Sequence, residues 1–189
     1  MKKIFLLLFV CINFVLGVDL LPGYLPNYTP MFAMRSLDTG VSLSPLRNTS
    51  SKLEDQNWIL REIVLDDELK QKDPLSKKLP FGYVQFVNPS NDDLCLAATS
   101  GSFKLKSCSN DLEFKHLETV FSIIPTTTSA VQIRSVAMDG AKCIVSLNSS
   151  APLDERFGLE PCIVDTGASL GLRQLVFFTP AIVEATPLY

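Results

Sequence analysis

YVQFVNPSNDDLCLAATSGSFKLKSCSNDLEFKHLETVFSIIP, residues 83–125, is the stretch of this chain that decides the fold. It starts with an alternating apolar run, contains two cysteines and closes on an aromatic strand around Phe121. Similar units lie on either side, with opening strands at Met34, Gln85 and Ile133, which are 51 and 48 residues apart (85 − 34 and 133 − 85). Three imperfect repeats of this length predict one pseudo-threefold domain rather than three domains.

The side-chain pattern of these units is that of short strands. Apolar and polar residues alternate from Val131 to Ser135, as in a half-buried strand. No long segment has a period of 3.6 residues. We therefore predict an all-β chain folded as a β-trefoil, a closed barrel with a hairpin cap.

A charged insertion, DDELKQKD at residues 66–73, separates the first and second repeats. Asp66/Lys70 and Glu68/Lys72 are spaced as i,i+4 pairs, and Pro74 should stop a helix at about Asp73. We expect one short exposed helix here, whose charges form a solvated face.

The N-terminus has the pattern of a secretory signal peptide. Lys2 and Lys3 precede an apolar run at residues 4–16, which the small Gly17 ends. This run is too short to span ~30 Å of hydrocarbon. A lipidated Cys11 is the alternative, but bulky residues precede it where small ones are expected, so no lipidation is predicted. We expect cleavage after Gly17 and export to the periplasm or the medium.

Charge and length limit what the exported chain can be. Cleavage after Gly17 would leave 172 residues (189 − 17) with a formal charge of −5 (15 basic minus 20 acidic). This length is enough for a single core. A mildly acidic chain without a basic run lacks the electrostatic footprint of nucleic-acid binding, so no nucleic-acid partner is expected.

Four cysteines would remain after cleavage, and three disulfide connectivities are possible. Each of the second and third repeats holds two cysteines at the same two places, which predicts Cys95–Cys108 and Cys143–Cys162. Such loops are worth ~3 kcal/mol each. No C-x-x-C occurs and His116 is the single histidine, so neither a metal nor another cofactor is expected.

The segment at residues 18–32 combines regularly spaced prolines with bulky apolar side chains. Prolines at every fourth residue block helix and sheet. A disordered tail is one interpretation, and an extended arm laid on a partner is the other. The candidate contacts of such an arm are Leu21, Tyr24, Leu25, Tyr28 and Phe32. The predicted organisation is a signal peptide at 1–17, an arm at 18–32, a β-trefoil at 33–180 and a tail at 181–189.

Longer strings resemble a known family. DQNW (55–58), IVLDDELKQKD (63–73), LPFGYVQF (79–86), ETVFSI (118–123) and PTTTSAVQIRS (125–135) are similar to the C subunit of the cytolethal distending toxins, with the A subunit as the nearest alternative. The resemblance runs from about Met34 to residue 188. Gln56-Asn57-Trp58 also resembles the Q-x-W signature of ricin B-chain-like lectins, which is degraded at 119–121 and 174–176.

The resemblance implies a non-catalytic member of a secreted three-part toxin. In that family the A and C subunits are trefoils that pair with each other, bind the host-cell surface and carry the B subunit, a DNase-I-like nuclease. The N-terminal arm of the C subunit lies against this nuclease. The surface ligand would be a glycan, a glycoprotein or cholesterol-rich membrane. The alternative function is a glycan-binding lectin module that acts alone.

The resemblance also points to specific positions. Ricin-type repeats bind sugar with an Asp two residues after the first cysteine, and Ala97, Val145 and Ser44 or Pro45 stand there instead, so the usual galactose site is expected to be absent. The family is associated with cholesterol-rich membrane, and a reversed cholesterol pattern fits residues 78–87. The candidate membrane contacts are Lys78, Leu79, Phe81 and Tyr83, although Phe81 and Tyr83 could instead enter the barrel.

The sequence contains no strong pattern of catalytic residues. Nuclease chemistry of the DNase-I type uses paired histidines with metal-binding carboxylates, and this chain has His116 alone. The adjacent pairs Asp92-Asp93 and Asp154-Glu155 would point to opposite faces of a strand. We expect no catalytic residue and no enzyme activity.

Overall fold

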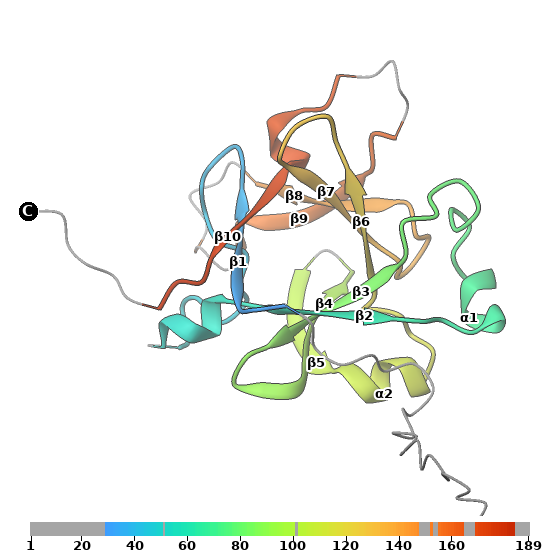
Figure 1. Ribbon diagram of the computed structural model, residues 1–189, viewed down its shortest axis with the longest axis horizontal. Helices are drawn as coiled ribbons and strands as arrows, with labels where there is room; N and C mark the ends of the chain where they lie inside the picture. The colour runs from blue at the N-terminus through green and yellow to red at the C-terminus, as the bar shows by residue number, and fades with distance from the viewer. Residues whose placement is uncertain are drawn as a thin grey trace, which may run out of the picture.

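The computed structural model of the chain describes residues 29–50, 52–100, 102–147, 152, 155–164 and 169–183 (Figure 1). Short strands dominate this part of the chain, with the helices α1 (Asp67–Gln71) and α2 (Cys108–Glu113) and two 3-10 turns, Leu53–Gln56 and Leu172–Gln174. The strands are β1 (Phe32–Ser36), β2 (Ile59–Ile63), β3 (Tyr83–Asn88), β4 (Asn91–Thr99), β5 (Ser102–Ser107), β6 (Phe121–Pro125), β7 (Val131–Ser135), β8 (Lys142–Ser146), β9 (Phe157–Pro161) and β10 (Val176–Pro180).

Six of these strands close into a ring. Antiparallel pairing runs from β1 to β10, β7, β6, β3 and β2, and a bridge between Phe32 and Trp58 returns from the start of β2 to β1. The hairpins β4–β5 and β8–β9 lie off the ring in the second and third repeats. In the first repeat, the described residues at the corresponding place form a bridge between Arg35 and Ser42 instead of a hairpin. This is the β-trefoil that the repeats predict.

The core contains the opening and closing strands of all three repeats. Its apolar cluster includes the opening residues Met34, Phe86 and Ile133 and the closing residues Trp58, Phe121 and Val176, all of which are buried. Phe86, rather than the Gln85 that the sequence spacing suggested, therefore shares the core with Met34 and Ile133. The Trp58 indole N–H donates to the Leu43 carbonyl at 2.9 Å, which satisfies its one polar atom.

Two buried glutamines link opening strands to closing positions. Gln85 Nε2 donates to Thr119 Oγ1 at 2.8 Å, and Gln132 Nε2 donates to Gln174 Oε1 at 2.8 Å. Thr119 and Gln174 occupy the first position of the two degraded Q-x-W motifs. A buried amide without a hydrogen-bond partner is costly. The polar side chains of Thr119 and Gln174 supply this partner to Gln85 and Gln132, although neither motif contains a tryptophan.

Helix α1 lies in the insertion, as predicted, but its charge pairs differ from the expected ones. The Asp66 carboxylate accepts from Leu69 N at 2.7 Å and so caps the helix instead of pairing with Lys70. Glu68 lies 2.6 Å from Lys115 Nζ rather than beside Lys72, because the helix ends at Gln71. The insertion is more than a solvated face, since Leu69 is buried among Ile63, Leu65, Leu117, Val120 and Val136.

Helix α2 was not expected from the sequence. It begins directly after β5, where the Ser107 hydroxyl accepts from Asn110 N at 3.1 Å as the N-cap. A serine followed by polar residues before a short helical turn is the signal that could have indicated it. The helix then carries the chain from the β5 strand to the loop before β6 (Figure 1).

A fully buried ion pair joins the insertion to the third repeat. Both side chains of Asp73 and Arg134 are 0% exposed, and Arg134 Nη1 and Nη2 donate to the two Asp73 oxygens at 2.7 Å each. Arg134 Nη1 also donates to the Gly140 carbonyl at 2.8 Å. Asp73 further accepts from Leu75 N and Tyr83 Oη, both at 3.0 Å.

These contacts determine the charge state of Asp73. Burial would raise the pKa of its carboxyl, but the hydrogen bonds and charge of Arg134 outweigh burial and hold the pKa below its ordinary value. Burial and the hydrogen bond to Asp73 raise the pKa of Tyr83 to about 12. The Asp73 carboxylate is therefore ionised and the Tyr83 phenol neutral at physiological pH.

Arg134→Met should leave the Asp73 carboxylate buried without a counter-charge. Removing one member of a buried ion pair costs about 3–5 kcal/mol, and we expect a loss of this size in the free energy of unfolding, measured by urea denaturation. Arg134→Met combined with Asp73→Leu should recover part of the loss, because no buried charge remains. The matched control is Arg173→Met, since the exposed Arg173–Glu160 pair is worth less than about 1 kcal/mol. Equal losses in the two single variants would contradict this role.

The stability of the fold should fall in acid, partly through Asp73. Its pKa is lower in the folded chain, so the ionised carboxylate stabilises the fold above the unfolded-state pKa of about 3.9. That contribution is lost as the pH falls through the lower folded-state pKa. Urea titrations between about pH 5 and pH 2 should show a smaller loss for Asp73→Asn than for the natural chain. Some loss should remain, because the pKa values of Asp55 and Asp93 are also lowered. Parallel curves for the two proteins would refute the assignment.

Candidate functional site

The positions that correspond to the sugar-binding Asp of ricin-type repeats carry no carboxylate. Ala97 and Val145 are 0% exposed and Ser44 is 1% exposed, whereas Pro45, the alternative in the first repeat, is half-buried and lines a cavity of about 420 Å³. Ala97 lies in β4 opposite Lys104, inside the hairpin of the second repeat. The carboxylate of the usual galactose site is therefore missing at these positions.

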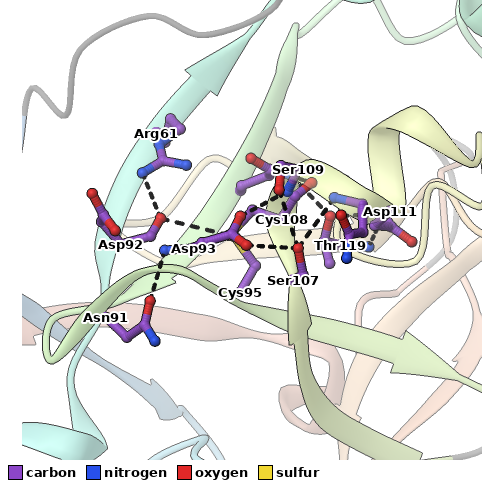
Figure 2. Close-up of a disulfide and its surroundings, with 12 residues drawn as sticks. Arg61, Asn91, Asp92, Asp93, Cys95, Ser107, Cys108, Ser109, Asp111 and Thr119 are labelled. Atoms are coloured by element: carbon purple, nitrogen blue, oxygen red, sulfur yellow. Dashed lines mark hydrogen bonds between the residues drawn. A yellow bond between two sulfur atoms is a disulfide. The ribbon is translucent and has the colours of Figure 1, made fainter.

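The disulfide of the second repeat connects β4 to the start of α2 (Figure 2). The structure contains both predicted disulfides, Cys95–Cys108 with Cα atoms 5.2 Å apart and Cys143–Cys162 with Cα atoms 4.9 Å apart. Each bond lies within its own repeat. Each joins the first strand of a hairpin, β4 or β8, to the residue that follows its second strand, β5 or β9.

Asp93 fixes the beginning of α2 beside this disulfide. Its carboxylate accepts from Ser107 Oγ at 2.7 Å and from Ser109 N at 2.9 Å, as Figure 2 shows. Burial would raise the pKa of Asp93, but these hydrogen bonds outweigh it and lower the pKa. The neighbouring Asp92 contributes its carbonyl, which accepts from Arg61 Nη2 at 2.8 Å. Asp93 therefore anchors the start of α2, and Asp92 connects β4 to Arg61 of β2.

The Asp111 carboxylate shapes the loop after α2. It accepts from Glu118 N at 3.1 Å, from Thr119 N at 2.9 Å and from Thr119 Oγ1 at 2.7 Å. Lys115 and Leu117 have φ values of 58° and 59°, which are unusual for residues other than glycine. These contacts hold the strained turn in place.

This turn forms one wall of a small pocket, which we call the Phe114 pocket. It has a volume of about 200 Å³ and is lined by Lys106, Ser107, Asn110, Asp111, Phe114 and His116. The Phe114 ring is 64% exposed and lies 6.1 Å from the His116 ring at an angle of 30°. An exposed ring beside amide and charged groups is a surface on which a sugar ring could stack, although the pocket is smaller than typical ligand sites of about 300–1,000 Å³.

Three groups at this pocket have the spacing of metal ligands. Single ligand atoms of Asp111, His116 and Glu118 lie within 4.8 Å of one another. However, Asp111 already accepts three hydrogen bonds and Glu118 forms an ion pair with Lys106. Both carboxylates therefore already have partners within the protein.

A larger apolar groove lies between the second and third repeats. It has a volume of about 680 Å³, and its apolar lining residues are Leu79, Phe81, Ile124, Pro125, Ile163, Val164 and Leu170. Phe81 is 46% exposed on its rim. The groove is built from three segments that are far apart in the sequence, so periodicity could not indicate it. A large exposed ring in an apolar groove is typical of an interaction surface.

The four candidate membrane contacts have different positions. Leu79 and Phe81 line the apolar groove, and Lys78 is exposed. Tyr83 points inward, because its hydroxyl donates to the buried Asp73 carboxylate. Lys78, Leu79 and Phe81 are thus placed for an external contact, whereas Tyr83 is not. Among the described residues, no helix is both long and apolar enough to cross a bilayer.

The predicted arm lies mostly outside the described residues. Leu21, Tyr24, Leu25 and Tyr28 fall there, as do the signal peptide and Asp154 of the second carboxylate pair. Phe32 belongs to β1 instead of the arm, and its ring packs on Phe86 and Phe178 at 6.4 and 5.0 Å. Thr29 is also tied to the barrel, because its hydroxyl accepts from Leu60 N at 2.8 Å. Any separate arm therefore ends before Thr29.

Solved structures share this fold. The crystal structure of the Haemophilus ducreyi cytolethal distending toxin matches with a TM-score of 0.61 and 22% identity, over 91% of this chain and 95% of the other. That of the Actinobacillus actinomycetemcomitans toxin gives 0.60 and 22%, over 87% and 97%. A BEL β-trefoil gives 0.52 and 16%, over 82% and 97%. At these identities the likeness establishes the β-trefoil fold alone.

Sequence comparison gives a family assignment. No curated protein matches the chain. Residues 31–187 match the model of the cytolethal distending toxin A/C domain, which spans all three repeats and both disulfides described above. The chain therefore belongs to the cytolethal distending toxin A/C domain family.

Proposed function

We propose that this chain is a non-catalytic binding component of a three-part cytolethal distending toxin, and that it is of the C type. The family match over residues 31–187 is the observation that carries the proposal. The choice of the C type over the A type rests on the strings quoted from the sequence. The chain would be exported, pair with a homologous A subunit and help to carry the B subunit, a nuclease, to the host-cell surface.

The apolar groove supports pairing with another toxin component. Its exposed Phe81 and neighbouring apolar side chains offer a surface that a partner can cover. By contrast, the carboxylates of Asp73, Asp93 and Asp111 accept hydrogen bonds from within the chain and hold the fold together. Recognition through an apolar surface fits an assembly role better than catalysis.

A second candidate function is glycan binding by the chain alone. The Phe114 pocket favours it, because an exposed ring lies beside the Asn110 amide and the His116 imidazole. The small volume of this pocket and the missing carboxylates at Ala97 and Val145 argue against a conventional lectin site. Assembly therefore remains the preferred function.

Deleting residues 18–28 should remove binding to the B subunit and leave pairing with the A subunit intact. The deletion should end before Thr29 because Thr29 and Phe32 contact the barrel. Co-purification of the mature chain with candidate A and B subunits, with and without the segment, measures both interactions. Phe32→Ala serves as a control that perturbs the barrel but keeps the arm. A full chain that binds neither partner would refute the proposed function.

Phe81→Ala should weaken pairing with the A subunit by about fivefold or more, because an aromatic anchor at an interface is often worth over about 1 kcal/mol. Phe114→Ala is the matched control, since it removes another exposed ring at a different site. Titration calorimetry of each variant against the purified A subunit gives the affinities. Glycan-array binding that depends on Phe114, without any pairing dependent on Phe81, would favour the lectin function instead.

A further inference from the structure

The two disulfides of this chain differ in how far they are shielded from solvent. Cys95 and Cys108 are both 0% exposed, and they form an apolar cluster with the buried Val87. Cys143 is also 0% exposed, but its partner Cys162 is only half-buried. Of the four disulfide cysteines, Cys162 is therefore the one that a molecule in solution can approach.

The chain after each hairpin explains this difference. Cys108 follows β5 and begins helix α2, and the cluster around its disulfide also includes the partly buried Ile59 of β2. Cys162 occupies the equivalent place after β9, directly behind the exposed Pro161. Residues 162–164 belong to no helix or strand. The disulfide of the third repeat thus lies where the chain leaves the hairpin.

The hairpin of the third repeat is held by more than its disulfide. Strands β8 and β9 are antiparallel partners from Lys142, opposite Pro161, to Ser146, opposite Phe157. The apolar core contains Ile144 and Phe157 of this hairpin and neither of its cysteines. Because backbone pairing and apolar packing keep the hairpin in place, the Cys143–Cys162 bond can open while the barrel stays folded.

The same disulfide restrains one wall of the apolar groove. Cys162 directly precedes Ile163 and Val164, which are two of the apolar lining residues. Hydrogen bonds also tie this stretch to the barrel, from Cys162 N to the Ala141 carbonyl at 2.9 Å and from Ile163 N to Gln174 Oε1 at 3.3 Å. The second bond is longer than is usual for an N–H donor. Loss of the covalent bond should therefore let Ile163 and Val164 move relative to the rest of the groove.

We propose that Cys162 is a site of thiol–disulfide exchange, and that reduction of the Cys143–Cys162 bond by a dithiol weakens pairing through the apolar groove. A thiolate of the dithiol attacks Cys162 Sγ, the bond to Cys143 Sγ breaks, and Cys143 leaves as a thiolate that takes up a proton. The second thiol of the reagent then displaces Cys162 as a thiol, and the dithiol becomes a disulfide. The exchange site rests on the burial of the cysteines, whereas its effect on pairing rests on the proposed function.

The first test labels the natural mature chain under mild reduction. The chain is treated with dithiothreitol for increasing times, and free thiols are alkylated with iodoacetamide and located by mass spectrometry of tryptic peptides. Each disulfide cysteine falls in a peptide of its own, at residues 79–104, 107–115, 143–156 and 157–173. We expect Cys143 and Cys162 to be alkylated at least about tenfold faster than Cys95 and Cys108, because exchange needs access to a sulfur atom.

The fluorescence of Trp58 shows whether the barrel stays folded during this reaction. Trp58 is the single tryptophan of the chain, and it is 0% exposed in the core. Its emission should remain that of a buried indole while Cys143 and Cys162 become alkylated. Equal alkylation rates for the two disulfides, or alkylation that begins only once the Trp58 emission shifts to that of an exposed indole, would overturn the exchange site.

Titration calorimetry against the purified A subunit, without reductant, measures the effect on pairing. Cys143→Ala combined with Cys162→Ala should weaken pairing by about fivefold or more, because Ile163 and Val164 would then have to be ordered on binding. The natural chain alkylated at these two cysteines is a second sample, which keeps the test valid if the variant does not fold. Cys95→Ala combined with Cys108→Ala is the matched control, since neither residue lines the groove.

Failure of the exchange site and failure of the proposed function give different results. Pairing that is unchanged in the alkylated chain, or weakened equally by loss of either disulfide, would overturn the effect on the groove. A natural chain that is alkylated first at Cys143 and Cys162 but does not pair with the A subunit would keep the exchange site and refute the toxin role.

Discussion

The carboxylate of Asp73 joins the insertion to the second and third repeats. It binds Arg134 of the third repeat, the hydroxyl of Tyr83 at the start of the second, and the backbone of Leu75 in the insertion. A buried charge must be fully paired, so the insertion has to reach the barrel at this point. The loop between Leu75 and Tyr83 is anchored at both ends, and this is why Leu79 and Phe81 are presented to the apolar groove.

Local pattern was sufficient for much of the fold. The alternation at Val131–Ser135 predicted β7, and the repeated cysteine positions predicted both disulfides. Local sequence pattern did not predict interactions between residues that are far apart in the sequence. The sequence predicted that Asp73 ends a run of solvent-exposed charges. Its partner Arg134 is 61 residues away, and nothing near Asp73 in the sequence indicates this pairing. The predicted partner of Lys70 was wrong because the Asp66 carboxylate caps the helix instead. The predicted partner of Glu68 was wrong because the helix ends at Gln71, before Lys72, and Glu68 pairs with Lys115.

The candidate surfaces were harder to predict than the fold. The sequence pointed to Phe81 and Leu79, which do line a groove, but it could not show that residues 124–127, Ile163, Val164 and Leu170 complete it. Tyr83 belonged to the same motif, yet its hydroxyl is committed to Asp73. Phe32 was predicted to belong to the arm, and it lies instead in β1 as a partly buried ring packed against the core. The proline-rich segment before it gives no sign of where strand pairing starts.

The three repeats share one core but not one surface. A symmetric lectin would use equivalent positions of each repeat, and here Ala97, Val145 and Ser44 are all buried. What differs lies at the surface, where apolar side chains gather in the groove between the second and third repeats. Because this groove is not repeated in the other two junctions by the same residues, a partner that recognises it would bind the chain in one orientation rather than in three equivalent ones. Pseudo-symmetry thus builds the barrel, and the sequence differences between the repeats break the symmetry of its surface.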